Sequence, residues 1–467
     1  MKMTKYKLGE LIEVTRGASL SGQFYAEEGK LIRLTLGNFN MNGGGFKENT
    51  SKTDLYFTGT VRDEFILNKG DIITPLTEQS LGLLGTTARI PESGKYIQSQ
   101  DVALVRCKEG LLDPNFCYYL ISSSIVRQQL SAAAQQTKIR HTSPEKIKNC
   151  TVWVPDFEVQ KNIGRILTDI DNKIAINRRI NDNLEAIAKQ LYDYWFVQFD
   201  FPNEEGKPYK SSGGAMVWNE KLKREIPQGW SGVSLKDLAL TSRNAITPVE
   251  NEVYQHFSIP SFDACGSYSL DNGSDIKSDK FVLQKGQLLV SKLNPWFNRV
   301  VWVPKGTNMI GSTEFVVLNP NNESESGYIY SVIKSPKFIA YCSQAATGTS
   351  HSQRRVSPDV LMAFKVVYEQ GVVQKYGCLI EKIQKQQAEL LSEIAMLTKQ
   401  RDELLPLLMN GQATVNYHLS AKAYPLPIAY KKAMPIEANQ IISSTFIQKS
   451  DSHTPSPRLQ TSQIHCS

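Results

Sequence analysis

Residues 376–409 read YGCLIEKIQKQQAELLSEIAMLTKQRDELLPLLM, and their apolar side chains recur at alternating spacings of four and three residues. The alternation holds without a slip at these positions: Tyr376, Ile380, Ile383, Gln387, Leu390, Ile394, Leu397, Arg401, Leu404 and Leu408. A seven-residue repeat with two seam positions is typical of a coiled-coil helix. The stretch therefore predicts a long helix whose narrow apolar stripe needs a partner helix.

A second segment of the same kind lies between residues 158 and 196. Its seam positions are Ile163, Leu167, Ile170, Ile174, Asn177, Asn181, Leu184, Ala188, Leu191 and Trp195, and its apolar face is widened by Ile176, Ile180 and Ile187. The alternative is that each helix packs only on its own domain. We expect the two helices to pair, with polar seam residues such as Asn177, Gln387 and Arg401 helping to fix register at some cost in stability.

The chain also repeats itself at long range. The hexapeptide FILNKG at residues 65–70 recurs as FVLQKG at residues 281–286, and Ser143-Pro144 recurs as Ser357-Pro358. In each copy, short strand-like runs and turns precede the long helix, which is an α+β pattern. Two equivalent domains related by an approximate two-fold axis require oppositely running helices. The sequence therefore predicts two repeated globular domains, each followed by a long α-helix, with the two helices forming an antiparallel coiled coil.

These patterns divide the chain into six segments. We predict a first globular domain at 1–156, a first long helix at 157–200, a polar Gly-rich linker at 201–230, a second globular domain at 231–369, a second long helix at 370–411, and a mostly disordered, Pro-containing tail at 412–467. The tail shows no periodicity that would build a core.

Basic residues are concentrated in two segments of the sequence, although the chain as a whole carries only a mild formal charge of +7. Residues 280–355 contain nine Lys and Arg against three Glu, and residues 114–148 contain five against one. Such basic segments form either solvated faces or nucleic-acid-binding surfaces. The seven cysteines form no Cys-x-x-Cys pair, and no apolar run approaches the ~18 residues of a membrane span. We expect a cytoplasmic protein with no membrane partner.

The sequence contains no recognisable catalytic constellation. No Gly-Lys pair continues as a phosphate-binding loop, and the six histidines never fall at metal-ligand spacing. Asn294-Pro295-Trp296-Phe297 is similar to the Asn-Pro-Pro-aromatic motif of amino-methylating DNA methyltransferases, but the second Pro and a preceding Gly-rich cofactor loop are missing. We therefore interpret it as a strand end and turn, and expect no catalytic, cofactor or metal site in this chain.

Two helix endings carry a family resemblance. The sequence LYDYWFVQF at residues 191–199 resembles the Leu-Phe-x-x-Trp-Phe-x-x-Phe ending of the specificity subunits of Type I restriction-modification enzymes, and LLPLLMNG at residues 404–411 is similar to the close of their second conserved helix. Together with the duplicated plan, the resemblance covers roughly residues 5–411. The tail departs from the usual ending.

The resemblance implies a non-catalytic subunit that reads double-stranded DNA. Each globular domain would be a target-recognition domain for one half of a bipartite, asymmetric site, and the helices would set the spacer. The implied partners are two methylating subunits and two restriction subunits, which would hold S-adenosylmethionine, ATP and Mg²⁺. The alternatives are a single-chain DNA methyltransferase or nuclease, and a coiled-coil adaptor without DNA specificity.

The best candidates for DNA contacts lie in the turn before each Ser-Pro pair. They are Gln136, Lys138, Arg140 and His141 in the first copy, and Gln353, Arg354 and Arg355 in the second, with Lys292, Asn294 and Arg299 as a second choice. Arg and Gln can bind guanine and adenine bidentately, whereas Lys and His more often contact phosphate.

Overall fold

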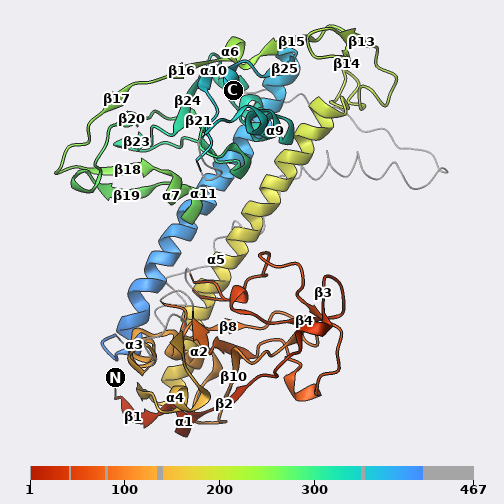
Figure 1. The fold of residues 1–467 in the computed structure, drawn as a ribbon. Helices are drawn as coiled ribbons and strands as arrows, with labels where there is room; N and C mark the ends of the chain where they lie inside the picture. Colours follow the sequence, from red (N-terminus) through yellow and green to blue (C-terminus); the bar gives the residue numbers. More distant parts are fainter. Residues whose placement is uncertain (1, 42–43, 79–81, 134–139, 349–352, 414–467) are drawn as a thin grey trace. The chain divides into compact units, whose positions relative to one another are not determined.

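A computed structural model describes residues 2–41, 44–78, 82–133, 140–348 and 353–413 (Figure 1). The chain divides into two compact units, of which unit 1 takes in the residues up to 174 and those from 396, and unit 2 takes in residues 175–395. Gln136 and Lys138 lie outside the described residues, as does the predicted tail beyond residue 413.

Unit 1 is built on a four-stranded antiparallel sheet in the order β2-β10-β6-β8. A second four-stranded sheet has the order β3-β5-β4-β9, and β1 pairs with β12 and β7 with β11. The strands are β1 (Thr4–Lys7), β2 (Ile12–Arg16), β3 (Tyr25–Ala26), β4 (Leu31–Arg33), β5 (Tyr56–Phe57), β6 (Ile72–Pro75), β7 (Thr77–Glu78), β8 (Ala88–Arg89), β9 (Tyr96–Ile97), β10 (Val102–Cys107), β11 (Arg140–His141) and β12 (Thr151–Val154).

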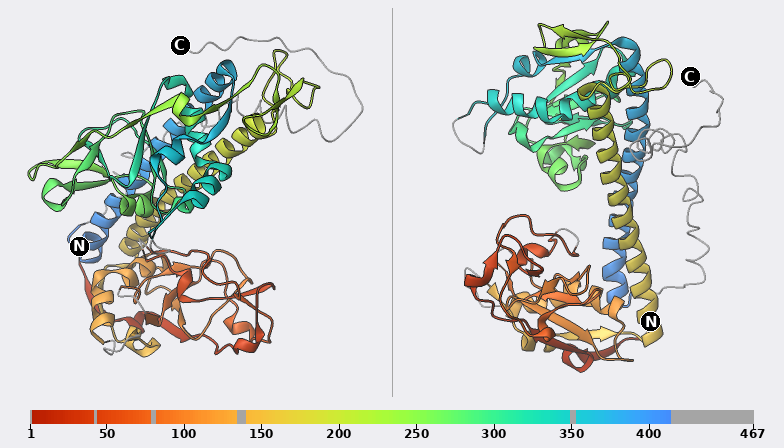
Figure 2. Two further views of the ribbon diagram at one scale, coloured as in Figure 1. Left: turned by 45° about the horizontal axis from the view of Figure 1, so that its top comes forward. Right: turned by 90° about the vertical axis from the view of Figure 1, so that its right-hand side faces the viewer.

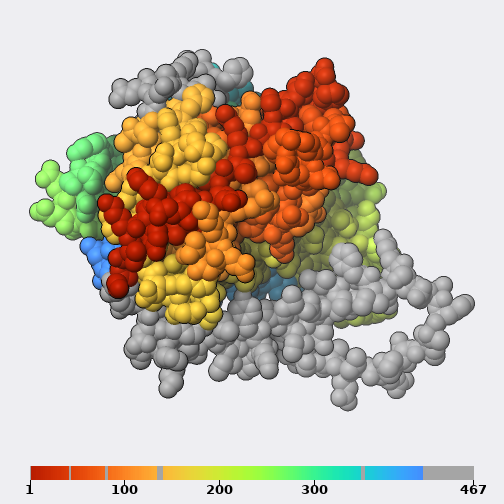
Figure 3. All heavy atoms as spheres, turned by 90° about the horizontal axis from the view of Figure 1, so that it is seen from below, coloured from red at the N-terminus to blue at the C-terminus, as the bar shows by residue number. Residues whose placement is uncertain are grey.

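The helices of unit 1 start where the sequence supplies caps. Asp113 accepts a hydrogen bond from the Phe116 backbone N–H, and Ser143 does the same for Lys146, each with a proline in the first turn. The helices are α1 (Leu8–Leu11), α2 (Pro114–Ser122), α3 (Ser124–Ala133), α4 (Pro144–Lys148) and the long α5 (Phe157–Tyr192), which begins in this unit. In Figure 3 the N-terminal residues (dark red) lie against later segments of the unit (orange to yellow), as the β1–β12 pairing requires.

Unit 2 repeats the frame of unit 1. Its four-stranded antiparallel sheet β16-β24-β21-β22 has the same connectivity as β2-β10-β6-β8, and β15 pairs with β25 as β1 does with β12. The strands of unit 2 are coloured from yellow-green to teal in Figure 2. Beside it lies a five-stranded sheet in the order β17-β20-β23-β18-β19. The strands are β13 (Met216–Asn219), β14 (Arg224–Pro227), β15 (Ser231–Ser234), β16 (Ala239–Ser242), β17 (Ala245–Ile246), β18 (Val253–Phe257), β19 (Ser269–Asn272), β20 (Lys280–Val282), β21 (Leu288–Ser291), β22 (Val300–Trp302), β23 (Met309–Gly311), β24 (Phe315–Pro320) and β25 (Lys365–Tyr368).

The helices of unit 2 follow the same order. They are α6 (Leu235–Leu238), α7 (Ile259–Cys265), α8 (Ser326–Lys334), α9 (Pro336–Ala345), α10 (Pro358–Met362) and the long α11 (Gln370–Met409). Ser357 caps α10 by accepting a hydrogen bond from the Val360 backbone N–H, as Ser143 caps α4. The predicted α+β fold with a repeated domain, each copy followed by a long helix, is confirmed.

The two long helices run antiparallel. In unit 2, Asn177 of α5 donates to Glu393 of α11, the Asn181 carbonyl accepts from Gln387, and the Ala188 carbonyl accepts from Tyr376. The residue numbers along α11 therefore fall as those along α5 rise. In unit 1, Ile163 and Leu167 of α5 share a core with Leu408 of α11. The predicted antiparallel coiled coil is thus confirmed. Ile176 and Ile180, which the sequence placed on its apolar face, are instead exposed.

Residues 201–230, predicted as a polar linker, are packed rather than loose. The strands β13 and β14 form a hairpin there, and the Phe201 and Tyr209 rings stack with centroids 4.8 Å apart. Phe199 at the end of the first helix segment packs edge-on against Trp230. The glycines suggested a loose connector, but these aromatic side chains supply enough apolar surface to fix the segment within unit 2.

Candidate nucleic-acid interface

The turn before each Ser-Pro pair is held by the same backbone hydrogen bonds in both units. In unit 1 the Leu76 N–H donates to the Asp101 carbonyl at 2.8 Å, and the Leu76 carbonyl accepts from Thr142 at 2.8 Å. In unit 2 the Lys292 N–H donates to the Glu314 carbonyl at 2.8 Å, and its carbonyl accepts from Val356 at 3.1 Å. The candidate turns therefore occupy equivalent places, beside the residue that follows β6 in unit 1 and β21 in unit 2.

In unit 1 the candidate turn is tied down by a buried carboxylate. Arg140 and His141 form β11, which pairs with Thr77 and Glu78 of β7. Glu78 is only 2% exposed, and its Oε2 accepts the backbone N–H groups of Gly82, Leu83 and Leu84 at 2.9–3.1 Å. Its Oε1 accepts from the Arg140 guanidinium at 3.3 Å. Arg140 is thus part of the frame, and the neighbouring His141 is the exposed member of the pair.

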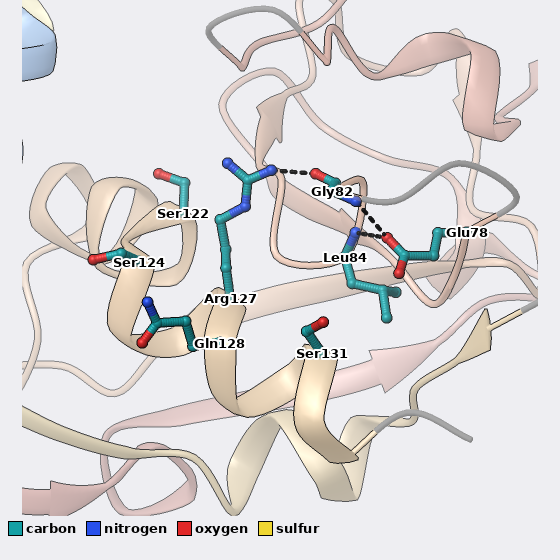
Figure 4. Close-up of a pocket in the computed structure, with 8 residues that line it drawn as sticks. All are labelled: Glu78, Gly82, Leu84, Ser122, Ser124, Arg127, Gln128 and Ser131. Carbon is teal, nitrogen blue, oxygen red and sulfur yellow. Dashed lines mark hydrogen bonds between the residues drawn. The ribbon is translucent and has the colours of Figure 1, made fainter. Parts of the chain in front are cut away.

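A hollow of about 400 Å³ borders this carboxylate (Figure 4). Serine side chains, Gln128 and the Arg127 guanidinium line it, and Arg127 donates to the Gly82 carbonyl. Arg140 also donates to the Ser131 carbonyl at 2.5 Å, which links the hollow to β11. The hollow is open to solvent, and its lining combines hydroxyl, amide and guanidinium groups with apolar carbon surface.

In unit 2 the candidate turn is held by an amide and a half-buried acid. The Asn294 N–H donates to the Arg354 carbonyl at 2.7 Å, and the Asn294 Oδ1 accepts from the Arg354 N–H at 3.0 Å. Arg355 makes two 3.0 Å hydrogen bonds to Glu314, which raise the pKa of its guanidinium. The structure therefore brings Lys292, Asn294, Arg354 and Arg355 together at one strand exit.

Arg299, a second-choice candidate, is held by an acid partner. Its guanidinium donates to both oxygens of Asp263, at 2.6 and 2.8 Å, and the residue is only 8% exposed. Of the other candidates, Gln353 is exposed and Lys292 is half-buried.

Sequence reasoning missed the acidic partners and Arg127. Glu314 was counted only as an offset to the local positive charge, and an acidic residue within a basic segment is the signal that could have identified an ion pair. Glu78 had no such signal, because its role depends on three backbone N–H groups that only the fold brings to it. The Asn294 side chain, similar to a methyltransferase asparagine in sequence, is bound to the Arg354 backbone.

Neither a metal site nor a membrane span is found where the structure is described. Within residues 2–41, 44–78, 82–133, 140–348 and 353–413, no three His, Cys, Asp or Glu side chains gather in a way that could hold a metal ion. No helix in the same ranges is both long and apolar enough to cross a bilayer.

Comparisons with known proteins find similarity to one family. Residues 1–186 match the family described as the Type I restriction modification DNA specificity domain. The MjaIX Type I restriction enzyme specificity subunit of Methanocaldococcus jannaschii is 23% identical over 325 residues, which cover 66% of this chain and 71% of that protein. The HindI specificity subunit of Haemophilus influenzae is 28% identical over 107 residues, 22% of this chain and 23% of the other.

Among solved structures, the chain is similar in fold to the S subunit of a Type I restriction-modification system from M. genitalium. The TM-score is 0.57 at 17% sequence identity, with 88% of this chain and 96% of the other covered. The similarity therefore extends over both units.

Proposed function

Since the chain belongs to the specificity subunits of Type I restriction-modification enzymes, we propose that it reads a bipartite, asymmetric DNA target, with one half-site for each unit. One observation carries the proposal: the same backbone frame presents a turn twice, with different side chains. His141 stands where unit 2 has Arg355, and Glu78 stands where unit 2 has Asn294. Equal frames with unequal side chains favour two different half-sites.

The partners follow from the same family membership. Specificity subunits work with DNA and with methylating and restriction subunits, and we propose two of each for this chain. S-adenosylmethionine, ATP and Mg²⁺ would be bound by those partners. The chain itself would contribute base contacts and a platform for assembly, in the cytoplasm.

Mapping of modified bases tests the proposal directly. The chain is co-expressed with its candidate methylating subunits, and methylated positions are mapped over the host genome. We expect a motif with two short, unequal halves separated by a spacer of fixed length. A single continuous motif would contradict the assignment of one half-site to each unit.

The spacer provides a second, quantitative test. Inserting one heptad between residues 174 and 175 of α5 and one between residues 395 and 396 of α11 preserves the seam, because Asn177 lies opposite Glu393. Seven residues add ~10.5 Å of helix, so the spacer should grow by about three base pairs. Inserting glycine-serine residues into the β13–β14 turn is the matched control, and it should leave the spacer unchanged.

The methyltransferase alternative is tested on the isolated chain. Photo-cross-linking with labelled S-adenosylmethionine should give no label above that of a control protein. A stoichiometric label would favour an enzyme.

A further inference from the structure

The turn between β21 and β22 carries two exposed aromatic side chains. Trp296 is 40% exposed and Phe297 is 57% exposed, and both belong to a single 3₁₀ turn, Pro295–Phe297. Their centroids lie 6.0 Å apart, so they form one continuous apolar tip. Exposed apolar surface of this kind is unfavourable in water and often marks a binding site.

The backbone holds this tip rigidly. Asn294 and Asn298, which flank it, both adopt the left-handed conformation, with φ of 48° and 50°. Asn294 is fixed by its two hydrogen bonds to the Arg354 backbone, and the Asn298 side chain donates to the Lys334 carbonyl at 3.4 Å. A turn with left-handed residues at both ends persists only where its surroundings impose it.

Arg299 supports the tip from behind. Its guanidinium carbon lies 4.5 Å from the centre of the Phe297 ring, while Asp263 of α7 holds the guanidinium on its other edge. The ring therefore stacks on a planar cation that is itself fixed by two hydrogen bonds. This gives Arg299, a predicted DNA-contacting residue, a different role, because its side chain is committed beneath Phe297.

We propose that Trp296 and Phe297 contact the bases of the half-site read by unit 2 and help to determine its sequence, with Arg299 as a positioning residue. The inference rests on the proposed function and names the side chains that carry part of it. The tip is hydrogen-bonded to the backbone of the Arg354 turn, at the same strand exit as Lys292. In duplex DNA, aromatic side chains contact the thymine methyl group in the major groove or wedge between base steps, and neighbouring cations bind the phosphates.

The tip also distinguishes the two copies in sequence. At the repeat offset of 216 residues, Trp296 and Phe297 correspond to Ser80 and Leu81. A contact made by two aromatic rings in one copy and not encoded in the other would give the two half-sites different base preferences.

The test compares three single variants of the full chain with its methylating subunits: Trp296→Ala, Phe297→Ala, and Trp218→Ala as a control. Trp218 is 58% exposed, lies on β13 and has no role in the proposal. Each complex is assayed by competition against duplexes carrying every single base change in the mapped target. We expect Trp296→Ala and Phe297→Ala to lower discrimination at one or more positions of the second half-site by about tenfold, roughly 1.4 kcal/mol. The first half-site and the Trp218→Ala control should be unchanged.

A fourth variant tests the positioning role. Arg299→Lys keeps the charge but loses the planar stack, so we expect the same loss of discrimination at the same positions, with an unchanged slope of affinity against salt. A lower melting temperature with unaltered base preference would reduce Arg299 to a structural residue and overturn its positioning role.

The outcomes separate the inference from the proposed function. If the wild-type complex gives no split target, the proposed function fails. If the wild-type gives a split target and both aromatic variants keep its discrimination at every position, or lose affinity equally for all sequences, the aromatic tip does not read bases and the inference is wrong.

Discussion

Unit 1 and unit 2 share one sheet frame but differ in the sheet beside it. The orders β2-β10-β6-β8 and β16-β24-β21-β22 are equivalent, whereas unit 1 adds four strands of two or three residues and unit 2 adds five strands of two to five residues. The frame positions the turn before each Ser-Pro pair, and the second sheet differs between the units. Under the proposed function, such a division would let one half of the target change without disturbing the other.

The two turns are also stabilised differently. Unit 1 uses the buried Glu78–Arg140 pair, whose carboxylate satisfies three backbone N–H groups as well. Unit 2 uses the Glu314–Arg355 pair, in which the two side chains are 30% and 45% exposed. Ion pairs with the same residue types should thus differ widely in their contribution to stability.

The largest effect is expected for Glu78→Ala. The change leaves three backbone donors without their acceptor and the half-buried Arg140 guanidinium without its counter-charge, so unit 1 should lose about 3–5 kcal/mol of its free energy of unfolding. Glu314→Ala in unit 2 should cost about 0–1 kcal/mol, because water replaces the lost contact. Urea unfolding followed by hydrogen exchange of peptides from each unit measures both. Equal losses in the two variants would show that burial does not distinguish the pairs.

The next largest loss of stability is expected for Asp171→Ala in unit 1. The two Asp171 oxygens accept from the Tyr119 hydroxyl at 2.6 Å and from Arg401 at 3.0 Å, so Asp171 joins α2 to both long helices within unit 1. Burial, together with the Asp171 charge, raises the pKa of Tyr119, and its hydroxyl therefore stays protonated as a donor. Asp171→Ala should destabilise unit 1 by about 2–3 kcal/mol.

The loss of stability for Asp171→Ala is to be compared with that for Glu185→Ala, which removes the Lys334–Glu185 ion pair of unit 2. Its Nζ and Oε1 atoms are 2.5 Å apart, and Glu185 is half-exposed. Glu185→Ala should cost about 1 kcal/mol or less. Differential scanning calorimetry of the two variants checks the ranking, and a larger loss for Glu185→Ala would reverse it.

The sequence predicted the long helices and the duplication because both depend on periodicity. Seam residues such as Ile163, Leu167 and Ile380 are buried as the heptads require. The apolar stripe of α5 is wider than the strip that α11 covers, which is why Ile176 and Ile180 are exposed. The hydrogen bonds of Asp171 were beyond prediction, since Tyr119 and Arg401 lie 52 and 230 residues away.

The candidate site was predictable in its location but not in the use of its side chains. The Ser-Pro landmarks gave the turns, and helix capping by Ser143 and Ser357 explains why these pairs recur. Arg299 and Arg355 were predicted to contact DNA, yet each has an acid partner, Asp263 and Glu314, 36 and 41 residues away. A local pattern of basic residues carries no information about such distant partners.

A smaller loss of stability, confined to unit 2, is expected for Tyr376→Phe. The Tyr376 hydroxyl donates to Ser331 at 2.8 Å and lies 3.4 Å from the Ala188 carbonyl, and its ring packs against Phe196. Tyr376→Phe keeps the ring and removes only the hydroxyl, so the loss should be about 1 kcal/mol in unit 2 and negligible in unit 1. Hydrogen exchange of α8 and α11 peptides provides the measurement, and a change of similar size in unit 1 would contradict it.

The smallest expected effect is a pH dependence of unit 2 that originates at His256. Its ring is buried, its Nδ1 lies 2.7 Å from Asp271, and desolvation lowers its pKa below the ordinary value of 6.5 despite that carboxylate, with the positive charge of Lys280 acting in the same direction. The unfolded chain therefore binds the proton more readily than the folded unit. Unit 2 should have its full stability above about pH 6.5 and lose stability as the pH falls from there toward the lower pKa of the folded state. His256→Gln should flatten this slope between pH 7 and 5 in urea titrations, and an unchanged slope would place the dependence on other groups.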